Sequence, residues 1–154
     1  MNRWFVVTSP LAVASMVLAG CGAGGAATTT KAQDLVVTAA VRTSIFDALA
    51  KSHQLPPKDY VSLIPKRTYY AFNPANRTYY AAAGLVASPH SLPAQVGTQD
   101  DGGYQLLTHK SGVATWKVYN DGLGGAEGST CPIAIPASVL AAWNWKPKSC
   151  APPN

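Results

Sequence analysis

Charged residues are scarce in this chain. They make up 12% of its 154 residues, and only 7 residues are acidic, whereas 47% are hydrophobic. The charged fraction is about half that of an average soluble domain. Disordered chains combine low hydrophobicity with high net charge, so we expect a folded chain, and the length fits one domain. After the first twenty residues no apolar run is long enough to span a bilayer, so we do not expect a polytopic membrane protein.

Catalytic motifs are also missing. The histidines His53, His90 and His109 show no paired-ligand spacing, and there is no G-x-S-x-G or S-x-x-K motif. His90 and His109 with Asp100 or Asp101 form the one conceivable metal or acid/base cluster, but an Asp-Gly pair is what a turn requires. We therefore expect no enzyme, no cofactor and no metal. The scattered basic residues carry no nucleic-acid-binding motif.

An export signal stands at the N-terminus. Arg3 precedes an apolar run over residues 4–18, and small residues precede Cys21. Leu18-Ala19-Gly20-Cys21 resembles the lipobox of bacterial lipoproteins, which implies cleavage before Cys21 and a diacylglyceryl group on its sulfur. Such acyl chains hold a protein at a membrane that its chain does not cross. The resemblance implies the extracytoplasmic face of the cell membrane as its location.

Three regions follow from this reading. Residues 1–20 are expected to be the signal peptide, residues 21–33 the lipidated cysteine with a Gly/Ala/Thr tether, and residues 34–154 one globular domain. The net charge of the whole chain is +5, and a modest positive charge favours anionic headgroups or wall polymers.

The lipid assignment leaves two cysteines, Cys131 and Cys150. In an oxidising compartment they are predicted to form a disulfide. The alternatives are a metal site, which lacks further ligands nearby, and two free thiols.

The domain begins with apolar residues three to four apart, which predict an amphipathic helix over 34–52 with Asp34 as its N-cap. Residues 59–65 are expected to connect it to a hairpin. Residues 67–72 (RTYYAF) and 77–82 (RTYYAA) flank the loop NPAN. A four-residue loop at 73–76 would place Tyr70 opposite Tyr79 and Tyr69 opposite Tyr80. The more apolar face of the hairpin is the predicted core face; it carries Tyr70, Phe72, Tyr79, Ala81, Ala83 and Leu85.

Three more strands are predicted over 94–99, 104–109 and 113–119, separated by turn residues. Their pairing would place Val96, Leu107, Trp116 and Val118 in the core. A short helix over 136–143 has a proline in its first turn, and the disulfide would clasp it, with Trp143 and Trp145, against the sheet. The fold class is therefore α+β, an antiparallel sheet of about five strands with an N-terminal helix and a short stapled C-terminal helix.

The opposite face of this sheet is the candidate ligand surface, because tyrosines on a floor of small residues suit stacking against a sugar ring or a partner side chain. Its residues are Tyr69, Tyr80, Gln99, Tyr104, Lys117 and Tyr119. The alternative is that the N-terminal helix covers this face and the tyrosines belong to the core.

These features favour a non-catalytic, lipid-anchored envelope module that binds a partner protein or a wall polymer. An inhibitor of a secreted enzyme, presenting loops such as 88–93 or 120–130, is the alternative, and a small hydrolase is the third class. A lipobox, an Ala/Gly/Thr tether and a Tyr/Trp-rich domain with a late disulfide are similar to the uncharacterised lipoproteins of high-GC Gram-positive bacteria. That resemblance implies location and no mechanism.

Overall fold

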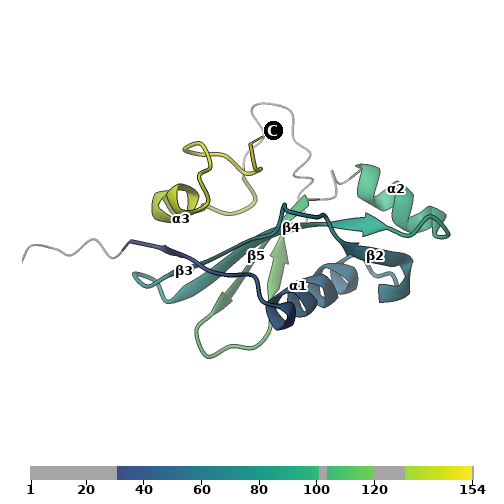
Figure 1. Ribbon diagram of the computed structural model, residues 1–154, viewed down its shortest axis with the longest axis horizontal. Coiled ribbons are helices and arrows are strands. Elements are labelled where there is room, and N and C mark those ends of the chain that lie inside the picture. The colour runs from purple at the N-terminus through teal and green to yellow at the C-terminus, as the bar shows by residue number, and fades with distance from the viewer. Residues whose placement is uncertain (1–30, 101–103, 120–130, 154) are drawn as a thin grey trace, which may run out of the picture.

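The computed structural model describes residues 31–100, 104–119 and 131–153. It confirms the α+β class: an antiparallel sheet carries α1 on one side and α3 on the other (Figure 1). In chain order the elements are β1 (Gln33–Asp34), α1 (Ala39–Ser52), the 3-10 turn η1 (Pro57–Asp59), β2 (Tyr60–Leu63), β3 (Tyr69–Asn73), β4 (Thr78–Ala87), α2 (Leu92–Asp100), β5 (Tyr104–Lys110), β6 (Lys117–Tyr119) and α3 (Ala137–Ala142).

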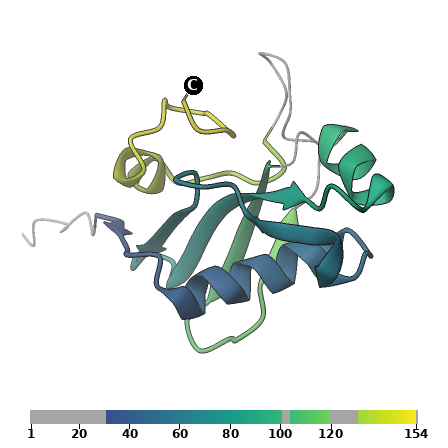
Figure 2. The ribbon, with the colours of Figure 1, turned by 45° about the vertical axis from the view of Figure 1, so that its right-hand side comes forward.

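The sheet has the order β1-β3-β4-β5-β6, and β2 pairs with the C-terminal part of β4. Strand β4 is its longest member and pairs with β3 and β5 as well. Figure 2 shows α1 running across one face of the sheet while α3 and the chain after it lie over the other.

The predicted β3–β4 hairpin forms, but its register differs by two residues from the expected one. Tyr70 pairs with Ala81 rather than Tyr79, and Asn73 pairs with Thr78, so the loop is 74–77. The side chain of Asn73 accepts a hydrogen bond from the amide of Ala75 (3.1 Å), which fixes this turn. Side chains alternate with a period of two, so a two-residue shift leaves every residue on its predicted face.

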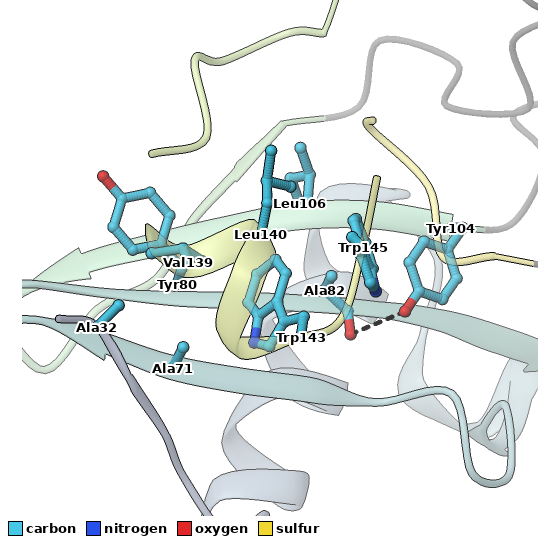
Figure 3. Close-up of a cluster of buried hydrophobic side chains, with 10 residues drawn as sticks. All are labelled: Ala32, Ala71, Tyr80, Ala82, Tyr104, Leu106, Val139, Leu140, Trp143 and Trp145. Atoms are coloured by element: carbon cyan, nitrogen blue, oxygen red, sulfur yellow. Dashed lines mark hydrogen bonds between the residues drawn. The ribbon is translucent and has the colours of Figure 1, made fainter. Parts of the chain in front are cut away.

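Both faces of the sheet are buried. The sequence predicted one core face and left open whether the other was a ligand surface or part of the core. On the α1 side, Ile45 and Leu49 pack with Ala81, Ala83 and Leu107. On the α3 side, Figure 3 shows a second cluster in which Trp143 and Trp145 lie over the strands. The alanines of β3 and β4 contribute little bulk, so the covering elements come close to the backbone. These alanines are Ala71, Ala81, Ala82 and Ala83, and all four are fully buried.

Helix α1 begins five residues later than predicted. Asp34 belongs to β1 rather than capping a helix, and the amide of Leu35 donates to Tyr70 O (2.9 Å). Thr38 is the N-cap, and its hydroxyl accepts from the amide of Val41 (3.3 Å). The β-branched residues before Thr38 lower helix propensity, so the chain stays extended there.

The strand predicted over 94–99 is wrong, because these residues form α2. The hydroxyl of Ser91 accepts from the amide of Ala94 (3.4 Å), and Pro93 stands in the first turn, where a helix tolerates proline. The side chain of Gln95 holds the preceding loop through Ser88 O (3.1 Å). Val96 is consequently 47% exposed instead of buried. The connector predicted over 59–65 is likewise wrong in part, since it contains β2.

The predicted disulfide between Cys131 and Cys150 is confirmed, with Cα atoms 5.3 Å apart. The helix predicted over 136–143 is α3, with Pro136 and Trp143 as its flanking caps. The disulfide thus joins the chain before α3 to the chain after Trp145, as the sequence predicted.

Candidate functional site

The six residues of the candidate ligand surface separate into three places. Tyr69 and Tyr104 lie beneath the segment that follows α3, where the Trp145 ring is 5.1 Å from Tyr69 and 6.3 Å from Tyr104 between centroids. The Tyr104 hydroxyl lies within hydrogen-bond distance of Arg67 O (2.7 Å) and Ala82 O (3.2 Å). Burial, followed by the neighbouring Tyr69, raises the pKa of Tyr104, against a smaller lowering by Arg67. Tyr104 is therefore part of the core, and the half-buried Tyr69 packs against it.

The cover over these tyrosines is α3 with Trp143 and Trp145, not the N-terminal helix that the alternative interpretation expected. Helix α1 packs against the opposite face of the sheet. A face that carries Tyr104 beside Ala82 is therefore buried by tryptophan rather than left open for a ligand.

Gln99 lies apart from the other five residues. It is exposed on α2, because its segment is a helix and not the sheet strand that would have carried it to the same face.

Tyr80, Lys117 and Tyr119 lie together on this face, although the Tyr80 side chain is itself 7% exposed and belongs to the α3-side core. Strand pairing sets Tyr80 opposite Thr108, and Thr108 opposite Lys117. The ammonium of Lys117 lies 4.9 Å from the centroid of the Tyr119 ring, within cation–π range.

A hollow of about 270 Å³ opens beside Tyr80 and Tyr119. We call it the polar hollow. It is lined by Asn76, Thr78, Tyr80, Thr108, Lys110, Tyr119, Ile133 and Ala134. Six of these side chains carry hydrogen-bonding groups, and none of the described lining residues is acidic.

Hydrogen bonds within the polar hollow hold its groups in place around Asn76. The Asn76 side-chain amide donates to the Tyr80 hydroxyl (2.9 Å), while its backbone carbonyl accepts from the Thr78 hydroxyl (3.0 Å) and the Lys110 ammonium (3.2 Å). Thr108 and Tyr119 share a longer hydroxyl contact of 3.4 Å. Each hydroxyl and the ammonium can make further hydrogen bonds, so the hollow presents fixed donors beside a positive charge.

The two histidines of the conceivable metal or acid/base cluster, His90 and His109, lie apart in the structure. His109 pairs with Tyr79 near the start of β4, whereas His90 follows the far end of the same strand. The side chains of Asp100 and Asp101 lie outside the described residues, as do Cys21 and the loop 120–130. Nowhere in residues 31–100, 104–119 and 131–153 do three His, Cys, Asp or Glu side chains gather as metal ligands would.

Sequence reasoning missed Asn76 and Lys110 as members of the site. Lys110 reaches the hollow because it pairs with Thr78 across β4 and β5. These strands are separated along the chain by α2, so only the correct assignment of α2 would have allowed their register to be worked out. The alternating pattern of 104–110 was the one available signal.

No known protein family, curated protein or solved structure matches this chain significantly. Among the described helices, none has the length and apolar character needed to cross a membrane.

Proposed function

We propose that this chain is a non-catalytic binding module, anchored at the extracytoplasmic face of the cell membrane through a lipid on Cys21, that binds an anionic polymer of the cell wall. The observation that carries the ligand assignment is the polar hollow, with its hydroxyl and amide groups beside Lys110. The anchor and location rest on the N-terminal sequence, which lies outside the described residues.

Charge supports an anionic ligand. Lys110 lines the polar hollow and Lys117 projects from the same face of the adjacent strand, while the described lining contains no carboxylate. Hydrogen bonds from an ammonium and from fixed hydroxyls to a phosphate or carboxylate oxygen are about twice as strong as those between neutral groups. A wall polymer that carries phosphate or carboxylate groups supplies this chemistry and lies next to a membrane-anchored domain.

Cosedimentation with purified cell wall tests the ligand. We expect the full-length chain, in a detergent without sugar headgroups, to sediment with wall material, and salt to weaken the association because exposed charges are screened. The variant Lys110→Gln should lower the bound fraction severalfold. Lys58→Gln, in the exposed turn η1 and outside the hollow's lining, serves as the matched control. Equal binding by the two variants would refute the role of the hollow.

The anchor is tested separately by Cys21→Ala. Without the thiol that receives the lipid, the protein should accumulate unprocessed or be shed into the medium. Recovery of the variant in the membrane fraction at the level of the parent protein would contradict the lipid anchor and would leave the wall-binding test unaffected.

A further inference from the structure

A second and larger hollow lies on the other face of the sheet. Its volume is about 510 Å³, and it runs between α1 and the segment that leads into β6. We call it the tryptophan groove. Helix α1 contributes Ser44, Asp47, Ala48, Lys51 and Ser52, and the facing segment contributes Ala114, Thr115, Trp116 and Val118.

The helical side of the groove is a continuous stripe. Counted from Ser44, the other positions lie three, four, seven and eight residues further along the chain, at 47, 48, 51 and 52. This spacing places all five on one face of a helix. The residues between them, Ile45 and Leu49, point into the core and fix α1 to the sheet. The polar stripe is therefore held in a defined position rather than carried on a loop.

Trp116 is oriented by contacts on several sides. Its indole N–H donates to the Ser44 hydroxyl (2.9 Å), which ties the ring to α1. The His109 ring meets it edge-on at 4.3 Å between centroids, and the Tyr70 ring lies at 6.2 Å. The side chain is still partly accessible and lines the groove. A preorganised aromatic ring of this kind offers contact area at a low entropic cost.

The groups around Trp116 include charges of both signs. Asp47 and Lys51 are exposed on adjacent turns of α1, and Ser52 and Thr115 add hydroxyls. A pyranose ring has a face of C–H groups and a rim of hydroxyls that both donate and accept hydrogen bonds. The C–H face matches the negative face of an aromatic ring, and the hydroxyl rim matches a carboxylate next to an ammonium. Because one acid offsets one base here, a neutral sugar fits better than an anion.

We propose that the tryptophan groove is a binding site for a neutral saccharide, in which a pyranose ring stacks on Trp116 and its hydroxyls bond to Asp47 and Lys51. The site is separate from the polar hollow and depends neither on the lipid anchor nor on an anionic ligand. A groove of about 510 Å³ accommodates one sugar ring and parts of the adjoining sugar units.

Titration of the full-length chain with oligosaccharides tests the proposal. The probes are chitotetraose and maltotetraose, and the readouts are calorimetry and the NMR signal of the Trp116 indole N–H, identified by its absence in Trp116→Phe. We expect at least one probe to bind and to shift that signal. Trp116→Ala should weaken binding at least tenfold, which corresponds to about 1.4 kcal/mol.

Four variants keep the test decisive if Trp116→Ala does not fold. Asp47→Asn is at an exposed helix position and should weaken binding severalfold, whereas Trp116→Phe keeps a stacking ring and should retain part of the affinity. Val113→Ala alters an exposed residue of the same segment that does not line the groove and should bind like the parent. Lys110→Gln, in the polar hollow, should also bind saccharide normally.

Several results would overturn the proposal. They are the absence of saccharide binding at millimolar concentration by the folded parent, unchanged binding in both Asp47→Asn and Trp116→Ala, and loss of saccharide binding in Lys110→Gln alone. Displacement of the Trp116 signal by a proline-rich peptide but by neither sugar would assign the groove to a protein partner. Loss of wall binding in Lys110→Gln together with normal saccharide binding would separate the two sites.

Discussion

Replacement of Trp145 by alanine is expected to destabilise the domain by about 3–5 kcal/mol, the range for removing a large buried aromatic side chain. Trp145 is 5% exposed and contacts the rings of Tyr69, Trp143 and Tyr104. It therefore holds together the α3 side of the core. Since a domain of this size is stable by only about 5–15 kcal/mol, the variant should approach the limit of folding.

Replacement by phenylalanine separates the ring from its polar group. Within the described residues the indole N–H of Trp145 is buried without a hydrogen-bond partner, and such a group costs about 1–3 kcal/mol. Trp145→Phe removes this group and keeps an aromatic ring against Tyr69. The stability lost in Trp145→Phe should therefore be small, about 1 kcal/mol or less, because removal of the unpaired donor offsets the cost of the smaller ring.

Urea unfolding followed by far-UV circular dichroism, with the disulfide intact, measures both variants. The control is Val61→Ala, at a side chain 62% exposed, which should change stability by no more than about 0.5 kcal/mol. A loss below about 1 kcal/mol for Trp145→Ala would show that α3 and its tryptophans do not form a core. Equal losses for the alanine and phenylalanine variants would refute the assignment of the cost to the buried ring.

Three other predictions concern the fold. Reduction of Cys131–Cys150, which closes a loop over a separation of 19 residues, should lower stability by about 3 kcal/mol in a chemical unfolding curve; a loss near zero would mean that the chain after Trp145 stays in place without it. Burial raises the pKa of Tyr104 above its unfolded value of about 10. The contribution of the neutral phenol to folding stability is therefore fully present below about pH 10 and is lost as the pH rises through the folded pKa. An alkaline absorbance titration should show one phenol that ionises only as the domain unfolds, and Tyr104→Phe should lack it. Val96→Asp should change stability by no more than about 0.5 kcal/mol because the site is exposed, whereas Leu107→Asp buries a charge and should prevent folding. A larger loss of stability for Val96→Asp than for Leu107→Asp would favour a strand over 94–99 instead of α2.

The faces of the β3–β4 hairpin could be predicted because they depend only on alternation. The register could not, since it is set by the side-chain contact of Asn73 with its own turn and by Arg77 in a left-handed conformation (φ 51°). The disulfide followed from elimination among three cysteines. The α+β class could be predicted from local patterns, namely the periodicity of apolar residues and the turn residues between them.

The errors lie where tertiary contacts decide between local alternatives. Residues 92–100 include Gly97 and Thr98, which are weak helix formers, so periodicity gave no strong helix signal. The helix forms because Ser91 caps it and Gln95 ties it to the preceding loop. Whether Tyr69 and Tyr104 are covered could not be decided from the sequence for a related reason. A pattern of tyrosines does not say that Trp143 and Trp145, which follow them much later in the chain, will pack over them.

The position of the two proposed sites follows from the way the sheet is covered. Because α1 and α3 bury the centre of both faces, the two hollows lie at the rim, and β6 is the edge strand that borders both of them. Tyr119 lines the polar hollow on one face, and Val118 lines the tryptophan groove on the other. Separate, well-spaced sites contribute additively to a free energy within about 0.5 kcal/mol. We therefore expect Lys110→Gln to lower the affinity for cell wall by the same free energy in the parent chain and in the Trp116→Ala variant. A deviation well beyond that limit would mean that the two sites grip one ligand group jointly around β6.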